Sequence, residues 1–321
     1  ENYFMLSSAY EIADDFFREN QFKINLSVKD GYLRNASIEF MDKNYAISKA
    51  VNDYVLVVDS DEYLRDGDVN ALKKLVSGNP KSVGRIKRID CFNDGTGYTE
   101  SVTWTNRLFD RRLFHYEHRI HEQVVKGSVF DCLDKRTYLY SEEQASYVTY
   151  ELNLVFDHDG YDGNRKYRDE KAKRNIRILL EELNKSPNDP YLLYQIGKSY
   201  YMLKDYEEAL EYFEKATRYD VDARNEWVLD LVNTYGYTML ELQKYNDALL
   251  LQGVADEFSY SSDYHFMMGL VYMNNAMFSD AVDAFLEAVK TGNAKVTGTD
   301  SYRAYYNIGV IYECLEKNDE A

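Results

Sequence analysis

The second half of the chain repeats a pattern of small and aromatic residues. One set consists of Gly197, Tyr200, Ala209, Phe213 and Ala216, and a second set with the same offsets consists of Gly269, Tyr272, Ala281, Phe285 and Ala288. Residues at helical spacing share one face of a helix, and small residues on that face let a neighbouring helix approach closely. The aromatic residues then fill the space toward the next pair of helices. The repeat therefore predicts stacked helix pairs after Pro187.

The spacing of this pattern resembles the tetratricopeptide repeat, a helix–turn–helix unit of about 34 residues. The resemblance implies an all-α solenoid over residues 187–321, with three full units and one partial unit that a capping helix would complete. The intervals lengthen around residues 221–226 and 291–300, which we expect to be loops or longer helices. Such a solenoid serves either as a spacer or dimerisation surface, or as a groove for a peptide or protein.

Composition excludes several classes of protein. The 321-residue chain has a formal net charge of −17, which opposes general binding to nucleic acid or anionic membranes, because both require Lys and Arg to neutralise phosphate. No apolar stretch approaches the roughly 18 residues of a membrane span. The three cysteines form no Cys-x-x-Cys pair, which is typical of a reducing compartment. The sequence therefore predicts a cytoplasmic protein with no membrane span and no nucleic-acid partner.

The first half alternates short helix-like and strand-like segments. Helical patterns cover residues 9–20, 43–51 and 66–77, and strand-like patterns cover residues 22–28 and 54–58. Such alternation is typical of an α/β domain with a mostly parallel sheet. Residues 82–156 are strand-rich, which predicts a further mixed or antiparallel lobe. We therefore expect an α/β domain with a mixed sheet at residues 1–162, a connecting helix at 163–186, and then the repeats.

A short apolar strand in the first half ends on two carboxylates. The run from Tyr54 to Val58 is apolar and β-branched, and Asp59 and Asp61 follow it directly. The chain spells Asp-x-Asp three more times, beginning at Asp66, Asp157 and Asp220. Only the pair at Asp59 follows a strand-like run, and a buried strand that delivers paired acids to a sheet edge suggests a metal and phosphate site. The alternative is that both acids cap a turn.

Four segments, in this order, resemble a family 2 glycosyltransferase of the GT-A (Rossmann-like) fold. They are Lys43 to Ala50, Asp53 to Leu64, Asn106 to Phe109 together with Arg119 to Gln123, and His158 to Tyr161. The resemblance implies a bacterial enzyme that moves a sugar from a nucleoside-diphosphate-sugar to a peptide, protein or glycan acceptor. It also implies an inverting direct displacement.

The resemblance assigns roles to the acids at the end of the strand. It implies that Asp61 is a metal ligand, that Asp59 faces the ribose or the metal, and that His158 is a third metal ligand. Oxygen and imidazole ligands suit Mn²⁺ or Mg²⁺, and such a cation stabilises a departing nucleoside diphosphate. It also implies that Lys43 and Arg107 are cations near the anionic donor. The alternative for His158 is a structural role before a glycine turn.

The segment from Phe114 to Gln123 holds three of the chain's five histidines. By the resemblance, Glu122 is the base that takes a proton from the acceptor nucleophile, and His121 lies beside it toward the acceptor. The alternative for Glu122 is an ion pair at a strand end with Arg119 or a neighbouring arginine. The histidines also leave open a zinc hydrolase that uses His121 and Glu122, although no cysteine accompanies them.

The N-terminal region departs from the family pattern. A complete domain of this fold begins with a strand, a helix and a second strand that ends in an acidic loop. Residues 1–6 resemble the second strand, but residues 7–9 read Ser-Ser-Ala where acids are expected. We therefore expect the first strand–helix unit to be absent from residues 1–162. The rival hypothesis is a catalytically degenerate transferase that acts as a repeat-based protein-binding scaffold. The aromatic repeat faces and the resemblance are both compatible with a homodimer.

Overall fold

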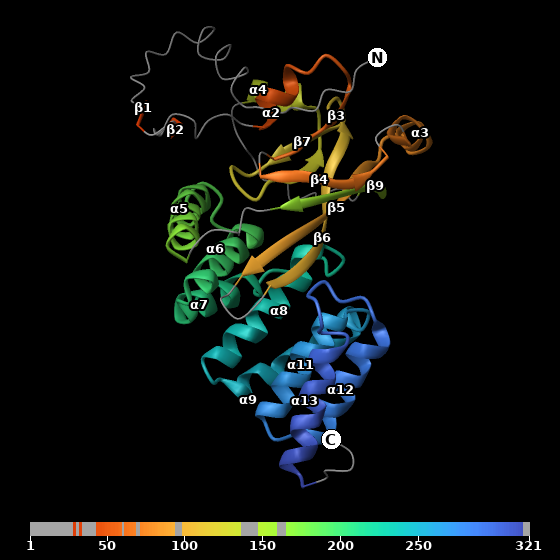
Figure 1. Ribbon diagram of the computed structural model, residues 1–321. Helices are drawn as coiled ribbons and strands as arrows, with labels where there is room; N and C mark the ends of the chain where they lie inside the picture. Colours follow the sequence, from red (N-terminus) through yellow and green to blue (C-terminus); the bar gives the residue numbers. More distant parts are fainter. Residues whose placement is uncertain are drawn as a thin grey trace. The chain divides into compact units, whose positions relative to one another are not determined.

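A computed structural model describes residues 28–29, 32–33, 43–59, 61–68, 71–93, 98–135, 147–158 and 165–316 (Figure 1). The chain forms two compact units, one of residues Glu1–Ile89 and Thr103–Gly160 and the other of residues Asp90–Val102 and Tyr161–Ala321. The expectations for residues 1–20, and for all but the last residue of the strand at 22–28, lie outside the described residues. Within the described ranges, no helix is long and apolar enough to cross a membrane.

The first unit is built from strands and short helices. Its described elements are β1 (Val28–Lys29), β2 (Tyr32–Leu33), α2 (Lys43–Ser48), β3 (Tyr54–Leu56), β4 (Glu62–Gly67), α3 (Leu72–Gly78), β5 (Val83–Asn93), β6 (Tyr98–Asp110), β7 (Phe114–Glu117), β8 (Gln123–Lys126), α4 (Val129–Lys135) and β9 (Thr149–His158). Five strands form one sheet in the order β3-β6-β5-β9-β4, and β1–β2 and β7–β8 form two small sheets. The long strands β5 and β6 continue into the second unit.

Among the described residues, the register is defined for two strand pairs of the main sheet, and both are antiparallel. Tyr54 pairs with Asp110 between β3 and β6, and Glu62 pairs with His158 between β4 and β9. The expectation of a mostly parallel sheet is wrong for these pairs. The apolar run at residues 54–58 reports burial on both faces of the sheet, and that burial does not determine strand direction.

Burial of β3 on both faces follows the two-residue period of a strand. Val55 and Val57 pack in a core with Ile47 of α2, where β7, β8 and the start of α4 also contribute. Leu56 packs in a second core with Leu72 of α3. Because successive side chains point to opposite faces, an apolar strand covered on both sides has no polar position. Strand β3 ends at Leu56, and Asp59 is the first acidic side chain after the apolar run.

The helix predicted at residues 66–77 begins later than expected. Strand β4 continues to Gly67, whose φ is +150° and whose backbone lies so close to Asn153 that a Cβ would meet the Asn153 oxygen at 2.6 Å. After this glycine the Asp68 carboxylate accepts a hydrogen bond from the Ala71 amide at 3.3 Å, and α3 begins at Leu72. The sequence prediction missed the edge strand because β4 is almost wholly exposed and has little apolar pattern.

In the second unit, the described residues from Arg165 onward form helices. Its elements are α5 (Arg165–Leu183), α6 (Pro190–Leu203), α7 (Tyr206–Ala216), α8 (Glu226–Glu241), α9 (Tyr245–Ala248), the 3₁₀ helix η3 (Leu249–Val254), α10 (Ala255–Phe258), α11 (Ser262–Asn274), α12 (Phe278–Thr291) and α13 (Tyr302–Cys314). Asp189 caps α6 by accepting hydrogen bonds from the amides of Tyr191 and Leu192. The intervals predicted to lengthen fall in the connections after α7 and α12.

The repeated glycines and phenylalanines are partners in one contact. A Cβ on Gly197 of α6 would meet the Phe213 ring of α7 at 2.7 Å, and a Cβ on Gly269 of α11 would meet the Phe285 ring of α12 at 2.6 Å. Both phenylalanines are completely buried. The same sequence interval therefore produces the same helix contact in two repeats.

The middle repeat departs from this regularity. Where the other units have one continuous second helix, this unit has the short α9, then η3, then the short α10. Its glycine, Gly236, lies against Met267 and Leu251 in place of an aromatic ring. A 3₁₀ segment has a tighter turn than an α-helix, so the second helix of this unit cannot pack as the others do.

We expect Gly269→Ala to destabilise the repeats although alanine is the better helix former. The added methyl overlaps the fully buried Phe285 ring, and overpacking of this kind costs about 1–3 kcal/mol. Urea unfolding followed by circular dichroism measures the change. The control is Gly253→Ala, since a Cβ there meets nothing within 4 Å. Equal stability of the two variants would contradict the close-approach role of Gly269.

Candidate active site

The end of β3 is closed by a turn that involves Glu62. The Val57 amide donates to the Arg107 carbonyl at 2.9 Å, which continues the contact with β6. The Glu62 amide then donates to the Asp59 carbonyl at 3.1 Å, and the Asp59 amide donates to Glu62 Oε2 at 3.0 Å. These two reciprocal hydrogen bonds fix the backbone that carries the predicted acids.

Arg107 of β6 joins the two carboxylates of this turn. Its Nη2 lies 2.6 Å from Asp59 Oδ2 and 2.5 Å from Glu62 Oε1. The Arg107 side chain is 4% exposed and the Glu62 side chain is 0% exposed. Burial lowers the pKa of Arg107, but Tyr116 and the two carboxylates raise it more, so its charge is retained. Arg88 of β5 adds a second cation, with Nη1 3.8 Å from Glu62 Oε1.

Lys43, the first residue of α2, connects Asp59 to Glu122. Its Nζ lies 2.8 Å from Asp59 Oδ1, 3.3 Å from Glu122 Oε1 and 5.4 Å from the centroid of the Tyr116 ring. Burial lowers the pKa of Lys43, but the attraction of Glu122 and Asp59 raises it overall. Neighbouring Asn44 orients this part of α2 by exchanging two hydrogen bonds with the Tyr116 backbone, at 2.6 and 2.8 Å.

Asp59 is therefore held by one cation on each carboxylate oxygen. Partial burial raises the pKa of Asp59, but Arg107 and Lys43 lower it more, and the net result is a pKa well below the usual range. The structure thus brings Asp59, Lys43, Arg107 and Glu122 into one charge cluster. It gives Arg107 a buried position between carboxylates, where the resemblance placed it beside a donor.

Asp61 and His158 form a second pair at the same edge of the first unit. The β4–β9 register sets Glu62 opposite His158, and His158 Nε2 lies 3.3 Å from Asp61 Oδ2. A carboxylate and an imidazole can share a Mn²⁺ or Mg²⁺ ion that takes its other ligands from water and substrate phosphates. In the described part of the chain no three His, Cys, Asp or Glu side chains gather around one point. The pair therefore fits a metal ion only if the substrate completes the shell.

The histidine-rich segment does not form a zinc cluster within the described residues. His115 uses Nδ1 in a contact with the Gly127 carbonyl at 3.0 Å, which ties β7 to the end of β8. His118 and His121 adopt positive φ angles of 70° and 56°. Left-handed backbone is uncommon for residues with a side chain and is concentrated at functional sites. His121 lies in this strained turn immediately before Glu122.

Sequence reasoning missed Glu62, Arg88 and Tyr116. The sequence neighbours of Glu62 give no sign of a fully buried acid. Its charged partners lie on β5 and β6, so the contact depends on sheet topology and not on local spacing. The only sequence signal for Glu62 was its position directly after the two strand-end acids.

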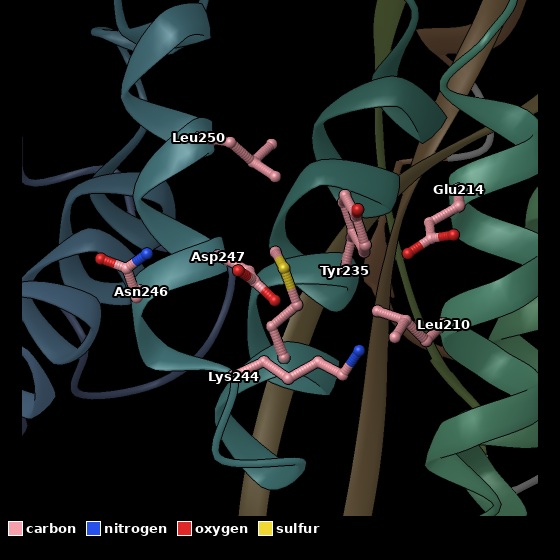
Figure 2. Close-up of a pocket in the computed structure, with 8 residues that line it drawn as sticks. Leu210, Glu214, Tyr235, Lys244, Asn246, Asp247 and Leu250 are labelled. Carbon is pink, nitrogen blue, oxygen red and sulfur yellow. The ribbon is translucent and has the colours of Figure 1, made fainter.

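The second unit contains an open groove of about 380 Å³ between α7, α8 and the α9–η3 segment. Leu210, Tyr235 and Met239 form its buried floor, and Leu250 is 55% exposed at the rim. Figure 2 shows Tyr235 between Glu214 and Asp247. Burial raises the pKa of the Tyr235 hydroxyl, and these two carboxylates raise it further. The groove lies beside the irregular second helix of the middle repeat.

Comparison with known proteins gives two independent likenesses. A family model described as Tetratricopeptide repeat matches residues 190–222, which include α6 and α7. The SPbeta prophage-derived glycosyltransferase SunS of Bacillus subtilis (strain 168) is 24% identical over 236 residues, which cover 65% of this chain and 51% of that protein. Glycosyltransferase SunS of Bacillus phage SPbeta matches to the same extent. The chain thus spans about half the length of the curated relatives it matches.

Several solved structures are also similar to part of the chain. MamA 41-end from Desulfovibrio magneticus RS-1 has a TM-score of 0.40 and 20% identity, over 49% of this chain and 89% of that one. YrrB, described as a TPR protein with an unusual peptide-binding site, has a TM-score of 0.40 and 20% identity, over 48% of this chain and 77% of that one. The repeat prediction is confirmed for residues 190–222. The comparisons also support a likeness to a glycosyltransferase, without the finer assignment to a family or fold.

The depressed pKa of Asp59 predicts a pH dependence of stability. An unfolded aspartate has a pKa of about 3.9, so ionised Asp59 stabilises the folded protein above that pH and loses this effect as the pH falls toward its folded pKa. The free energy of unfolding should favour the wild type over Asp59→Asn near neutral pH, and the difference should shrink below about pH 4. Urea unfolding in metal-free buffer at several pH values measures it.

The matched control for this prediction is Asp66→Asn, which removes an exposed acid from β4. It should differ little from the wild type at any pH. A difference between the wild type and Asp59→Asn that stays constant from neutral to acid pH would contradict the proposed ion pairs.

Proposed function

We propose that this protein is a metal-dependent glycosyltransferase of family 2 with a GT-A fold. It moves a sugar from a nucleoside-diphosphate-sugar to a peptide, protein or glycan acceptor by an inverting displacement. The similarity to glycosyltransferase SunS over 236 residues supports the class of reaction. The tetratricopeptide repeat match at residues 190–222 supports a peptide or protein acceptor. A cytoplasmic location, a bacterial source and a homodimer belong to the same proposal.

The observation that carries the proposal is the position of Lys43 between Asp59 and Glu122. Lys43 joins Asp59, which the resemblance places near the donor, to Glu122, which the resemblance assigns as the base. These two acids lie far apart in the sequence. A carboxylate within hydrogen-bond reach of an acceptor nucleophile can take its proton. On this proposal, the acid that faces the donor and the acid that accepts the proton share one cation in the first unit.

The proposed reaction is a single displacement. The acceptor hydroxyl or thiol gives its proton to the Glu122 carboxylate while its oxygen or sulfur forms a bond to the anomeric carbon. The bond from that carbon to the diphosphate breaks, and its electron pair leaves with the nucleoside diphosphate. Asp61 and His158 are the residues that would hold a divalent cation. When bound, such a cation supplies positive charge to the departing diphosphate.

A second candidate function is a binding scaffold derived from a transferase. The groove of the second unit, with its apolar floor and acidic rim residues Glu214 and Asp247, favours this alternative. Both oxygens of Asp59 are also occupied by side chains of the protein itself. The two functions differ in whether a nucleoside diphosphate binds in the first unit.

We expect the protein to bind a nucleoside diphosphate in the presence of Mn²⁺, and Asp61→Ala to lose most of that binding. Removal of one carboxylate from a two-residue ligand set weakens metal binding because the remaining His158 offers a single contact. Isothermal titration calorimetry with several nucleoside diphosphates measures the affinity. Asp66→Ala, which changes an exposed acid on β4, is the control. If the wild type binds none of them with Mn²⁺ or Mg²⁺, the scaffold function is preferred.

We expect Glu122→Gln to retain nucleotide binding and to lose sugar transfer by at least about 10²-fold, the usual contribution of a general base. The amide keeps the shape of the side chain but cannot accept the proton. The measurement compares nucleotide affinity with transfer to the acceptor. Glu151→Gln, which changes an exposed acid on β9, is the control. Transfer by Glu122→Gln at a rate close to the wild type would show that another group is the base.

A further inference from the structure

The family resemblance places Arg107 near the donor, but its surroundings indicate a different task. Its side chain is 4% exposed, and one nitrogen, Nη2, contacts both Asp59 and Glu62. Its Nε is buried and has no hydrogen-bond partner among the described residues. A guanidinium that is covered by protein and already faces two carboxylates has little capacity left for an anionic ligand.

Glu62 has the complementary position. Its side chain is completely buried, with Oε1 2.5 Å from Arg107 Nη2 and Oε2 accepting the Asp59 amide at 3.0 Å. The Glu62 carboxylate therefore contacts both the Arg107 guanidinium and the Asp59 backbone, and Arg107 in turn contacts the Asp59 side chain. A buried acid is costly unless it is paired, so this arrangement resists any other position of the turn.

The ion pairs also cross the main sheet. Arg107 lies on β6 and Glu62 begins β4, and in the strand order β5 and β9 separate these two strands. Arg88 of β5 lies between them and approaches Glu62 at 3.8 Å. The position of the Asp59 turn is thus determined by charged groups from strands that are not its neighbours in sequence.

We propose that Glu62 and Arg107 are positioning residues that hold Asp59, and through it Lys43, in place, and that Arg107 does not bind the donor diphosphate. This inference rests on the proposed function where nucleotide affinity is concerned. Lys43 is the more accessible cation, 24% exposed against 4% for Arg107, and contacts the other oxygen of Asp59. Of the two cations that contact Asp59, Lys43 is therefore the one that an anionic donor can reach.

A double-mutant cycle separates positioning from direct binding. We expect Glu62→Gln and Arg107→Met each to weaken nucleoside diphosphate binding with Mn²⁺ by about 10- to 100-fold, the usual effect of removing a residue that orients a ligand. The nucleotide affinity of the double variant should be no lower than that of the single variant with the lower affinity, because both residues act through the same turn. Effects that multiply in the double variant would mean that Arg107 touches the nucleotide itself, and would overturn the inference.

The chain offers a matched control for loss of an arginine that bridges two acids. Arg112 lies 2.8 Å from Asp53 and 2.7 Å from Asp110, at the opposite end of the β3–β6 pair. Arg112→Met also removes the partner of a buried acid, Asp110, but it should leave nucleotide affinity within about twofold of the wild type, since its two acids are not those of the Asp59 turn. Arg107→Lys keeps the charge and should recover part of the affinity that Arg107→Met loses. No recovery, or an equal loss in Arg112→Met, would show a general effect on folding and refute positioning.

A measurement without ligand keeps this inference distinct from the proposed function. Glu62 uses one oxygen for Arg107 and the other for the Asp59 amide, whereas glutamine has a single acceptor oxygen and cannot serve both. Amide hydrogen exchange of peptides that contain residues 57–62 should therefore accelerate at least about tenfold in Glu62→Gln and not in Arg112→Met. If the wild type binds no nucleotide, the proposed function fails and this exchange still decides the positioning role. Unchanged exchange in a folded Glu62→Gln protein would overturn the inference even if nucleotide binds.

Discussion

The ion pairs of Arg107 are the constraint on which the candidate site depends. A guanidinium buried in the sheet must be matched by carboxylates, and Asp59 and Glu62 supply them at 2.6 and 2.5 Å. This requirement determines the position of the turn between β3 and β4. The turn places Asp59 in contact with Lys43. Because Lys43 also contacts Glu122, the segment before β8 is included in the same charge network. Removal of any one member leaves an uncompensated charge in a largely buried place.

The charges of this cluster also bear on the proposed need for a metal. Lys43, Arg88 and Arg107 face Asp59, Glu62 and Glu122, so the cations of the cluster are already compensated by acids. Asp61, which lies beside His158, adds another carboxylate. In a chain whose formal charge is −17, an anionic donor gains little from such a balanced cluster. On the proposed function, a divalent cation supplies the attraction that the protein's own side chains do not.

The sequence predicts best where one local period decides the structure. The Gly197–Phe213 and Gly269–Phe285 contacts repeat because one helix period and one turn length place them together, and the lengthened intervals fall in connections between helices. The direction of β3 relative to β6 was not predictable in this way, since an apolar run indicates that a strand is buried but not which strand it pairs with. For the candidate site, the acids at the end of an apolar run indicated Asp59, and the family resemblance implied Glu122; their roles stay predictions. Glu62 was missed because its partners come from β5 and β6, which no local pattern connects to it.

The difference between Arg107 and Lys43 follows from their chemistry as well as from their burial. The planar guanidinium presents fixed donors and suits a permanent contact with two acids, whereas the ammonium group ends a flexible chain and can change partners at lower cost. Arg107 occupies the buried position and Lys43 the partly exposed one. An exchange of the two residue types would place a flexible cation beneath the turn and a rigid one at its surface. The buried Arg107 and the partly exposed Lys43 therefore suit a site in which the turn is held fixed while the lysine can respond to an anionic ligand.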